Sequence, residues 1–387
     1  MFTRNFYLIA AVIVIVVGIA IVTFLPFFQA RTKWVQENVI SFNEIERNPI
    51  GLAIDGNTLV VLTRQSDFKK PLSLDSIYIY TYNGKNWLQQ SELTIPEEKP
   101  GEGYVLDYLT AIDRNTILVG ANVFTRSGET WSLTTKLQSP FDNSGIAESI
   151  AINGDTAIIS LKFAIHVFRR NRDTGYWLFE AEIKRIDTES YPYSRGKVAV
   201  DGNIIVDGNR VYRRSSTNDW QQEARLALNK KPIRRISQVD ISGNTIVVGM
   251  HTQFTDPDGR GTAHVFENNP NTGVWEYKTK LVPHDIVPFA IYGFGSSIAI
   301  DGSTIIAGHG FRVSNNNLAW SLSGWYVPQP KGRAYIFIRN KNGRWLRSAK
   351  LRPSNNQPTA GGVTISGNRV IISGKDDKKL YIFKRVD

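Results

Sequence analysis

Two short apolar segments separated by a tight polar turn recur seven times along this chain. Each copy reads as an apolar strand, a polar turn, a second apolar strand and then a small residue, as in SIAIDGSTIIAG. Apolar runs of about four to eight residues bounded by turn residues predict β-strands. The copies begin at Leu52, Thr110, Ser149, Val198, Val239, Ser297 and Val363.

A second hairpin follows the first in six of the seven copies. It has an apolar and aromatic third strand, a polar turn and a fourth strand that opens on a tryptophan. These residues are Trp87, Trp131, Trp177, Trp220, Trp275 and Trp345. Four strands repeated about every 51 residues predict an all-β, seven-bladed β-propeller. Large aromatic side chains at matching places favour packing between blades over a cofactor site.

The seventh copy ends after its third strand, and no tryptophan follows it. Its missing strand is predicted at the other end of the chain, because WVQENVI from Trp34 resembles WLQQSEL from Trp87. We expect this N-terminal segment to pair beside Tyr381 and to complete the last blade. Such closure removes two open sheet edges, which are prone to aggregation.

Residues 7–28 form an uncharged apolar stretch long enough to cross a bilayer as one helix. The alternative is an unusually long signal peptide, but secretory apolar regions are typically about 7–15 residues. We therefore expect a membrane anchor in residues 1–30 and the propeller in residues 31–387. Basic residues follow the stretch at Arg31 and Lys33, which by the positive-inside rule would keep the propeller in the cytoplasm. The segment before this stretch is only a few residues long and is easily kept in the cytoplasm. We therefore place the propeller outside the cytoplasm, in a single-pass membrane protein.

Composition narrows the chemistry. The chain has no cysteine, which excludes disulfides, thiolate catalysis and cysteine-ligated metals. Its net charge of +11 suggests anionic surroundings. The basic pairs are dispersed and an anchor is expected, so we predict no nucleic-acid partner. Because blade packing accounts for the repeated tryptophans, we also predict no cofactor.

This repeat pattern resembles that of one known protein family. The segment SIAIDGSTIIAGHG, preceded by Phe294 and Gly295, together with RAYIFIRNKNGRWLRSAKL, resembles the FG-GAP repeat proteins, whose blades are similar to those of the integrin α-subunit. The resemblance implies a seven-bladed propeller used in adhesion or protein interaction. It does not carry over calcium sites, because two-residue turns such as Asp55-Gly56 cannot supply the about 6–8 oxygen ligands that calcium takes.

Three long loops between second and third strands, residues 63–75, 250–262 and 309–332, indicate which face of the ring recognises a partner. The last loop holds the aromatic residues Trp320, Trp325 and Tyr326, which blade packing does not require. These could anchor a partner or stack on sugar rings, or they could cap the sixth blade. The other binding candidates are His309, Arg312, Arg234 and Arg235.

A metal site is not predicted, although one loop contains acidic residues. Its candidate ligands would be Asp256, Asp258 and His251, and the default interpretation is a solvated turn. The sequence favours a membrane-anchored, non-enzymatic propeller that binds a protein or glycan through its long-loop face. The alternative is a propeller enzyme acting on extracellular or cell-wall glycans, which would need a pair of carboxylates.

Overall fold

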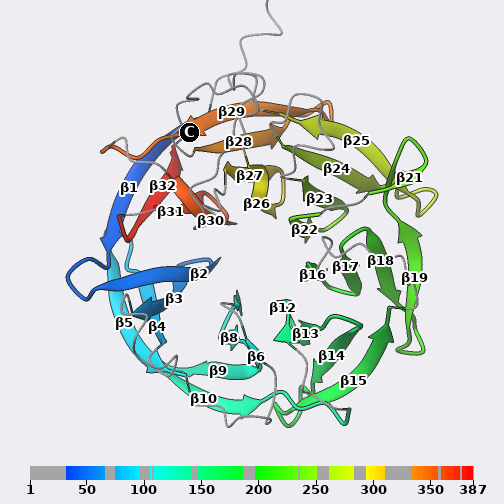
Figure 1. The fold of residues 1–387 in the computed structure, drawn as a ribbon, viewed down its shortest axis with the longest axis horizontal. Coiled ribbons are helices and arrows are strands. Elements are labelled where there is room, and N and C mark those ends of the chain that lie inside the picture. The colour runs from blue at the N-terminus through cyan, green and yellow to red at the C-terminus, as the bar shows by residue number, and fades with distance from the viewer. Residues whose placement is uncertain are drawn as a thin grey trace, which may run out of the picture.

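Seven four-stranded antiparallel sheets surround a common centre in the computed structural model (Figure 1). The structure describes residues 32–65, 75–95, 105–106, 109–141, 146–185, 197–233, 236–250, 261–282, 293–309, 333–355, 359–374 and 377–386. The predicted all-β, seven-bladed propeller is therefore confirmed.

Four consecutive strands form each of the first six blades. Blade one contains β2 (Arg47–Asp55), β3 (Thr58–Gln65), β4 (Ser76–Tyr82) and β5 (Trp87–Thr94). Blade two contains β7 (Thr110–Asp113), β8 (Thr116–Val119), β9 (Asn122–Ser127) and β10 (Thr130–Lys136). Blade three contains β12 (Ser149–Asn153), β13 (Thr156–Ser160), β14 (Ala164–Arg170) and β15 (Trp177–Lys184).

The next blades follow the same order. Blade four contains β16 (Val198–Asp201), β17 (Ile204–Asp207), β18 (Arg210–Arg214) and β19 (Trp220–Arg225). Blade five contains β22 (Gln238–Ser242), β23 (Thr245–Met250), β24 (Thr262–Asn268) and β25 (Trp275–Leu281). Blade six contains β26 (Phe294–Asp301), β27 (Thr304–His309), β28 (Ala334–Arg339) and β29 (Trp345–Leu351).

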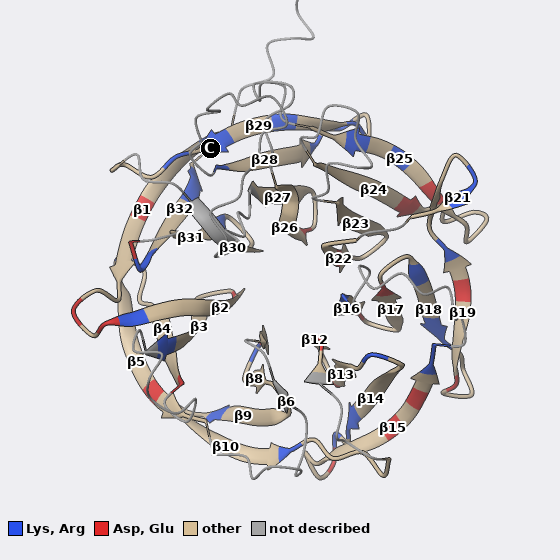
Figure 2. Cartoon of the chain, in the orientation of Figure 1, with Lys and Arg blue, Asp and Glu red and all other residues tan. Residues whose placement is uncertain are grey.

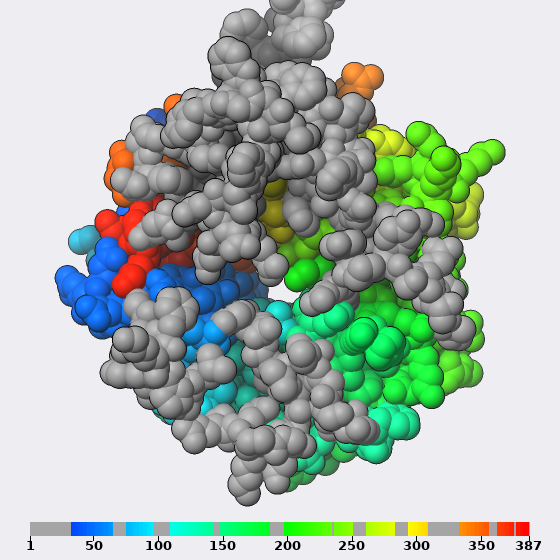
Figure 3. Space-filling view, in the orientation of Figure 1, coloured from blue at the N-terminus to red at the C-terminus, as the bar shows by residue number. Residues whose placement is uncertain are grey.

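Two short strand pairs lie outside the blades. β6 (Val105–Leu106) and β11 (Ile146–Ala147) are parallel, and β20 (Ala227–Leu228) and β21 (Lys231–Pro232) are antiparallel. Charged residues lie mainly in the outer strands and the turns of the ring (Figure 2). The space-filling view shows a narrow opening at its centre (Figure 3).

Blade seven is built from both ends of the described chain. It contains β30 (Thr359–Ser366), β31 (Arg369–Gly374), β32 (Lys379–Val386) and, as its outer strand, β1 (Lys33–Ser41). The antiparallel register places Trp34 opposite Arg385 and Val39 opposite Tyr381. The predicted closure of the ring by the segment from Trp34 is confirmed.

The hairpin between the first two strands of every blade is bonded to its neighbour. In each blade the last residue of the first strand accepts a hydrogen bond from the turn of the following blade. Asp301 of blade six, for example, accepts from the Gly367 backbone N–H of blade seven at 2.6 Å, and Ser366 of blade seven accepts from that of Gly56 in blade one at 2.9 Å. The other acceptors are Asp55, Asp113, Asn153, Asp201 and Ser242.

These seven bonds form a closed girdle around one mouth of the ring. They explain why Asp, Asn or Ser occupies the turn, since each supplies a side-chain oxygen to an otherwise unpaired N–H. The donor residue has positive φ in every blade, and Arg114 takes this conformation where the other six blades have glycine. The four aspartates at these turns therefore have a structural role, each with a specific backbone partner in the next blade.

The hydrophobic core lies between blades. Trp345 of blade six packs in one cluster with Val247, Ala263 and Val265 of blade five. Trp131 likewise packs on blade one, and Trp275 on blade four. The predicted role of the tryptophans in blade-to-blade packing is confirmed, and each buries a large apolar area there.

Phe294 and Gly295 occupy the junction between blades five and six. Phe294 is fully buried and makes edge-to-face contacts with Tyr335 and Phe337. Gly295 has a φ of +80°, and a Cβ there would lie 2.3 Å from the backbone oxygen of Thr262. This position therefore requires glycine for conformation and for space.

The expected membrane helix, residues 7–28, lies outside the described residues. Within the ranges given above, the structure contains no helix long and apolar enough to span a bilayer.

Candidate functional site

Every outer strand of the ring carries one bulge, and the extra residue at each bulge is polar. The register between the third and fourth strands of each blade skips one residue, always the third after the tryptophan that opens the outer strand. The skipped residues are Glu37, Gln90, Thr134, Glu180, Glu223, Lys278 and Ser348. A bulge re-aims the side chain of its extra residue.

At several junctions this residue accepts hydrogen bonds from the following blade. The indole N–H of Trp131 donates to Gln90 Oε1 at 3.3 Å, and that of Trp275 donates to Glu223 Oε1 at 2.7 Å. Arg214 of blade four donates through Nε to Glu180 Oε1 of blade three at 2.7 Å. Between blades one and two and between blades four and five, the bulge residue and the tryptophan thus join neighbouring blades by a hydrogen bond beside the apolar core.

The junction between blades five and six departs from this arrangement. Its bulge residue is Lys278, which cannot accept a hydrogen bond. The acceptor is instead Glu267 at the end of β24, which takes the indole N–H of Trp345 at 3.1 Å and Arg339 Nη2 at 2.8 Å. Lys278 pairs with Glu276 on its own strand at 2.7 Å.

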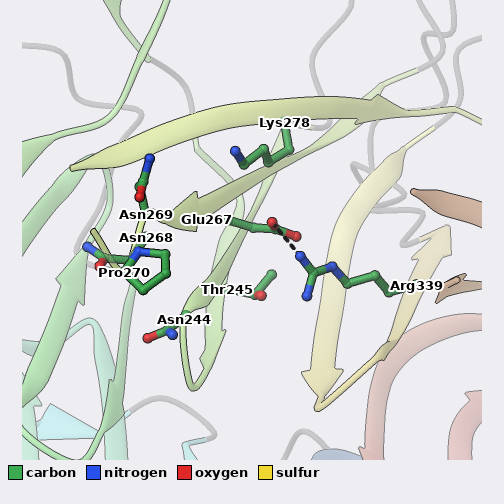
Figure 4. Close-up of a pocket in the computed structure, with 8 residues that line it drawn as sticks. All are labelled: Asn244, Thr245, Glu267, Asn268, Asn269, Pro270, Lys278 and Arg339. Carbon is green, nitrogen blue, oxygen red and sulfur yellow. Dashed lines mark hydrogen bonds and ion pairs between the residues drawn. The ribbon is translucent and has the colours of Figure 1, made fainter. Parts of the chain in front are cut away.

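A polar pocket of about 380 Å³ lies at this junction. The pocket lies on the hairpin side of the ring, between the first and third turns of blade five and the end of β28 (Figure 4). Its lining residues are Asn244, Thr245, Glu267, Asn268, Asn269, Pro270, Lys278 and Arg339. We call it the junction pocket.

The lining of the junction pocket is polar. Lys278 and Arg339 carry N–H donors but are paired with Glu276 and Glu267, and the asparagines supply amide groups that both donate and accept. Its volume is near the lower end for small-ligand sites, which suits one or two sugar rings or a short peptide segment. The lining contains one carboxylate, Glu267, which is already engaged by Trp345 and Arg339.

A second group of titratable residues lies around the centre of the ring. Asp240 in β22 occupies the position where five other first strands have alanine and β30 has Thr364. Its carboxylate accepts from the backbone N–H of Ile241 at 2.9 Å and from that of Ile300, in blade six, at 2.8 Å. Burial raises the pKa of Asp240 to about 7 against these two bonds, and the charges of Asp201 and Asp301 raise it further.

Replacing Asp240 with alanine should make stability less dependent on pH. The folded-state pKa of about 7 lies above the ordinary value of 3.8, so ionising this carboxyl destabilises the fold increasingly as the pH rises from about 4 to 7. D240A should thus be more stable than the parent at pH 8 and no more stable at pH 4. Between pH 4 and pH 8, the difference in free energy of unfolding between D240A and the parent should change by an amount on the order of a few kcal/mol.

Urea unfolding of both proteins at pH 4, 6 and 8 tests this expectation. The exposed residue Asp173 provides the control, because D173A should follow the parent at every pH. Parallel pH profiles for the parent and D240A would show that burial of Asp240 has no energetic consequence.

The sequence-predicted binding residues fall mostly outside the described part of the chain. This holds for Trp320, Trp325, Tyr326, Arg312, Arg234 and Arg235, and for the metal candidates Asp256, Asp258 and His251. His309 ends β27 with its backbone opposite Phe294, and its side chain is not among those described. These assignments stay predictions.

The described histidines belong to the core of the blades. His166 in β14 is buried beside Phe141 and Phe179, with Nε2 3.6 Å from a carboxylate oxygen of Glu182. Burial lowers its pKa, and Glu182 only partly opposes that shift. Among the described residues there is no group of three His, Asp or Glu side chains arranged to hold a metal ion.

The junction pocket was not predicted from the sequence, although a signal for it exists. The third residue after each outer-strand tryptophan is Glu, Gln, Thr or Ser in six blades and Lys only in blade five. A comparison of the copies at that position would have singled out Lys278.

Comparisons with known proteins support the fold alone. A scan against protein-family models gave no match, and neither did a search of curated proteins. Among solved structures, the chain is similar to a candidate 6-phosphogluconolactonase from Bacteroides uniformis, with a TM-score of 0.55 and 13% identity over 86% of this chain and 93% of that one. It is also similar to the WD40 β-propeller domain of Doa1, with a TM-score of 0.51 and 11% identity over 92% and 98% of the two chains.

Proposed function

We propose that this protein is a non-enzymatic propeller that binds a glycan or protein partner, held at a membrane by residues 7–28 with the ring outside the cytoplasm. The observation that carries the binding role is the junction pocket, where Lys278 stands at the bulge position from which Gln90, Glu180 and Glu223 accept hydrogen bonds from the next blade. The chemistry of its lining favours a ligand rich in hydroxyl groups and carrying a carboxylate, such as an acidic oligosaccharide or an acidic peptide segment.

A closed ring suits such a role. The girdle of turn bonds and the bulge contacts fasten the blades, so a ligand meets a preorganised surface and less of its binding free energy is spent on ordering the protein. The resemblance of Phe294-Gly295 and the blade-six strands to FG-GAP repeat proteins agrees with an interaction module. We extend that resemblance to a proposed role in adhesion.

The long loop of blade six remains part of this proposal. Trp320, Trp325 and Tyr326 would add a stacking surface for sugar rings or an anchor for a protein segment. The junction pocket lies on the face of the ring that carries the first and third turns of the blades, whereas the sequence predicts recognition on the opposite, long-loop face. A binding experiment must therefore test both surfaces separately.

Binding of the full-length protein in detergent to an array of neutral and uronic-acid oligosaccharides tests the proposal. We expect binding to acidic members and a loss of about tenfold in affinity for K278A, which corresponds to one charge-assisted hydrogen bond. Lys280, two residues along the same strand and exposed, does not line the pocket, so K280A is the matched control.

The aromatic loop is tested in the same assay. If W320A/W325A/Y326A loses binding and K278A does not, the partner binds the long-loop face and not the junction pocket. Binding that neither variant reduces, or the absence of binding to any acidic saccharide or acidic peptide, would contradict the proposal.

A second candidate function is a propeller enzyme acting on extracellular or cell-wall glycans, and Asp240 is the observation that favours it. A carboxyl group with a pKa of about 7 near two others has the protonation behaviour of a general acid or base. Turnover of cell-wall glycans that D240N abolishes without unfolding the ring would establish this alternative.

A further inference from the structure

The positive charge of this chain is concentrated in one segment. Between Asp301 and Asp376 the sequence contains eleven Lys and Arg and no Asp or Glu. The whole chain has 46 basic and 35 acidic residues, so the remaining 35 basic residues are balanced by 35 acidic ones. The entire net charge of +11 therefore belongs to this acid-free segment, which includes β28 and β29 of blade six and β30 and β31 of blade seven.

Part of this charge lies exposed on the outer edge of blade six. Arg369 and Arg339 are paired with Glu37 and Glu267 and contribute to blade junctions. The exposed members around β29 are Lys341, Arg344, Arg347 and Arg352. Figure 2 shows blue and no red along β28 and β29, in contrast to β15 and β19 on other blades.

The first described residues of the chain lie against the same edge. Thr32 Oγ1 is hydrogen-bonded to Ser348 Oγ in β29. Further along β1, Gln36 donates to Ser354 Oγ at 3.0 Å and accepts from the Ser354 backbone N–H at 2.9 Å. Lys33, also exposed, adds a basic side chain there. We call Lys33, Lys341, Arg344, Arg347 and Arg352 the basic rim.

Only a short length of chain separates the ring, at the basic rim, from the apolar stretch of residues 7–28. Residue 28, the last of that stretch, is four residues before Thr32. Four extended residues reach at most about 14 Å, so the entry point of the ring cannot be farther than that from the end of the stretch. This reach is less than twice the screening length of about 8 Å at physiological ionic strength, so exposed charges at the entry point can interact with charged headgroups of an adjacent bilayer.

We propose that the basic rim binds the anionic lipid headgroups of the membrane in which residues 7–28 are anchored, so that the ring stands on the edge of blade six. This inference rests on the anchor in the proposed function. Blades two and three, across the ring from β29 in Figure 1, then point away from the bilayer. The openings of the ring face sideways, so the two faces remain open to a partner.

Site-specific labels can test this orientation because the chain has no cysteine of its own. Leu346 in β29 and Leu133 in β10 are matched positions, with exposed fractions of 42% and 44%. The full-length L346C and L133C proteins would each carry one fluorophore and be placed in lipid nanodiscs with a quencher attached to the headgroups. The discs would contain phosphatidylcholine with or without phosphatidylglycerol.

We expect the Leu346 probe to be quenched about two- to threefold more strongly than the Leu133 probe in anionic discs, with the difference falling in neutral discs and at high salt. R344Q/R347Q/R352Q should abolish the difference. K85Q/K162Q/K184Q removes the same number of exposed charges from blades one and three and should leave it unchanged.

The outcomes separate the two proposals. A protein that high salt washes off the discs lacks the anchor, which overturns the membrane part of the proposed function and the rim contact with it. A protein that stays in the discs while both probes are quenched equally overturns the rim contact alone. Quenching that persists in R344Q/R347Q/R352Q also contradicts it, because the charges would then not be its cause.

Discussion

Replacing Arg369 with methionine should lower the free energy of unfolding by about 2–4 kcal/mol, because the half-buried Glu37 carboxylate loses both hydrogen bonds from the guanidinium and keeps the more distant Lys384, 3.9 Å away. Arg369 Nε lies 2.9 Å from Glu37 Oε2, and Nη2 lies 3.3 Å from Oε1. The guanidinium also stacks on Tyr82, 3.8 Å from the ring centroid, and donates to Asn57 Oδ1 at 3.3 Å. One side chain thus joins β31, the closing strand β1 and blade one.

Urea unfolding of the full-length protein in detergent, followed by tryptophan fluorescence, measures this effect. The double variant E37L/R369M should lose less than the sum of the single changes, since neither charge is then left alone. Arg172 makes an ion pair with Asp155 on the surface, with 82% of its side chain exposed, so R172M should change stability by no more than about 0.5 kcal/mol. Equal effects of R369M and R172M would contradict the role assigned to the closing pair.

The contribution of this pair should disappear in acid. Burial pushes the pKa of Glu37 upward, but the hydrogen bond and charge of Arg369 outweigh it and hold the pKa below the ordinary value of 4.5. A lowered pKa means that the stabilisation is complete above that value and is lost as the pH falls through the folded-state pKa. The difference between the parent and R369M should therefore shrink at the acidic end of the same titration.

Replacing Gly295 with alanine should cost at least about 3 kcal/mol, combining backbone strain at positive φ with a steric conflict. The new Cβ would lie 2.3 Å from the Thr262 backbone oxygen, and a carbonyl within a strand ladder cannot move away freely. The loss should appear as a lower urea midpoint and a lower melting temperature, because the two blades are pushed apart at a core junction.

Gly302 separates the two causes. It also has a positive φ, +53°, but nothing lies within 4 Å of a Cβ built there. G302A should therefore show the conformational cost alone, about 1–2 kcal/mol. If G295A and G302A were equally destabilising, close packing at Phe294-Gly295 would not be the reason for glycine at this position.

The sequence was sufficient to predict the architecture because the repeat is visible in local patterns. Strand periodicity, turn residues and outer-strand tryptophans recur at matching positions, and the likeness of the segments at Trp34 and Trp87 predicts closure. Each of these signals depends on residues near one another in the chain. The blade count follows from repetition, which distant contacts do not obscure.

The polar bonds between blades could not be predicted in the same way. That Asp301 accepts from Gly367, or that Glu223 receives the indole of Trp275, depends on how two blades are placed side by side. The junction pocket depends in addition on a bulge at the third residue after the tryptophan, a position whose significance appears only when the seven outer strands are compared. Asp240 was also missed, because its unusual position appears only when the seven first strands are aligned residue by residue.

Blade seven makes the stability of the ring depend on strands from distant parts of the chain. A ribosome produces β1 first and β32 last, so the ring stays open throughout synthesis and shuts only after the final strand has emerged. A prematurely terminated product would keep β1 without its partner and display an unprotected strand edge, the feature that proteases and chaperones act on.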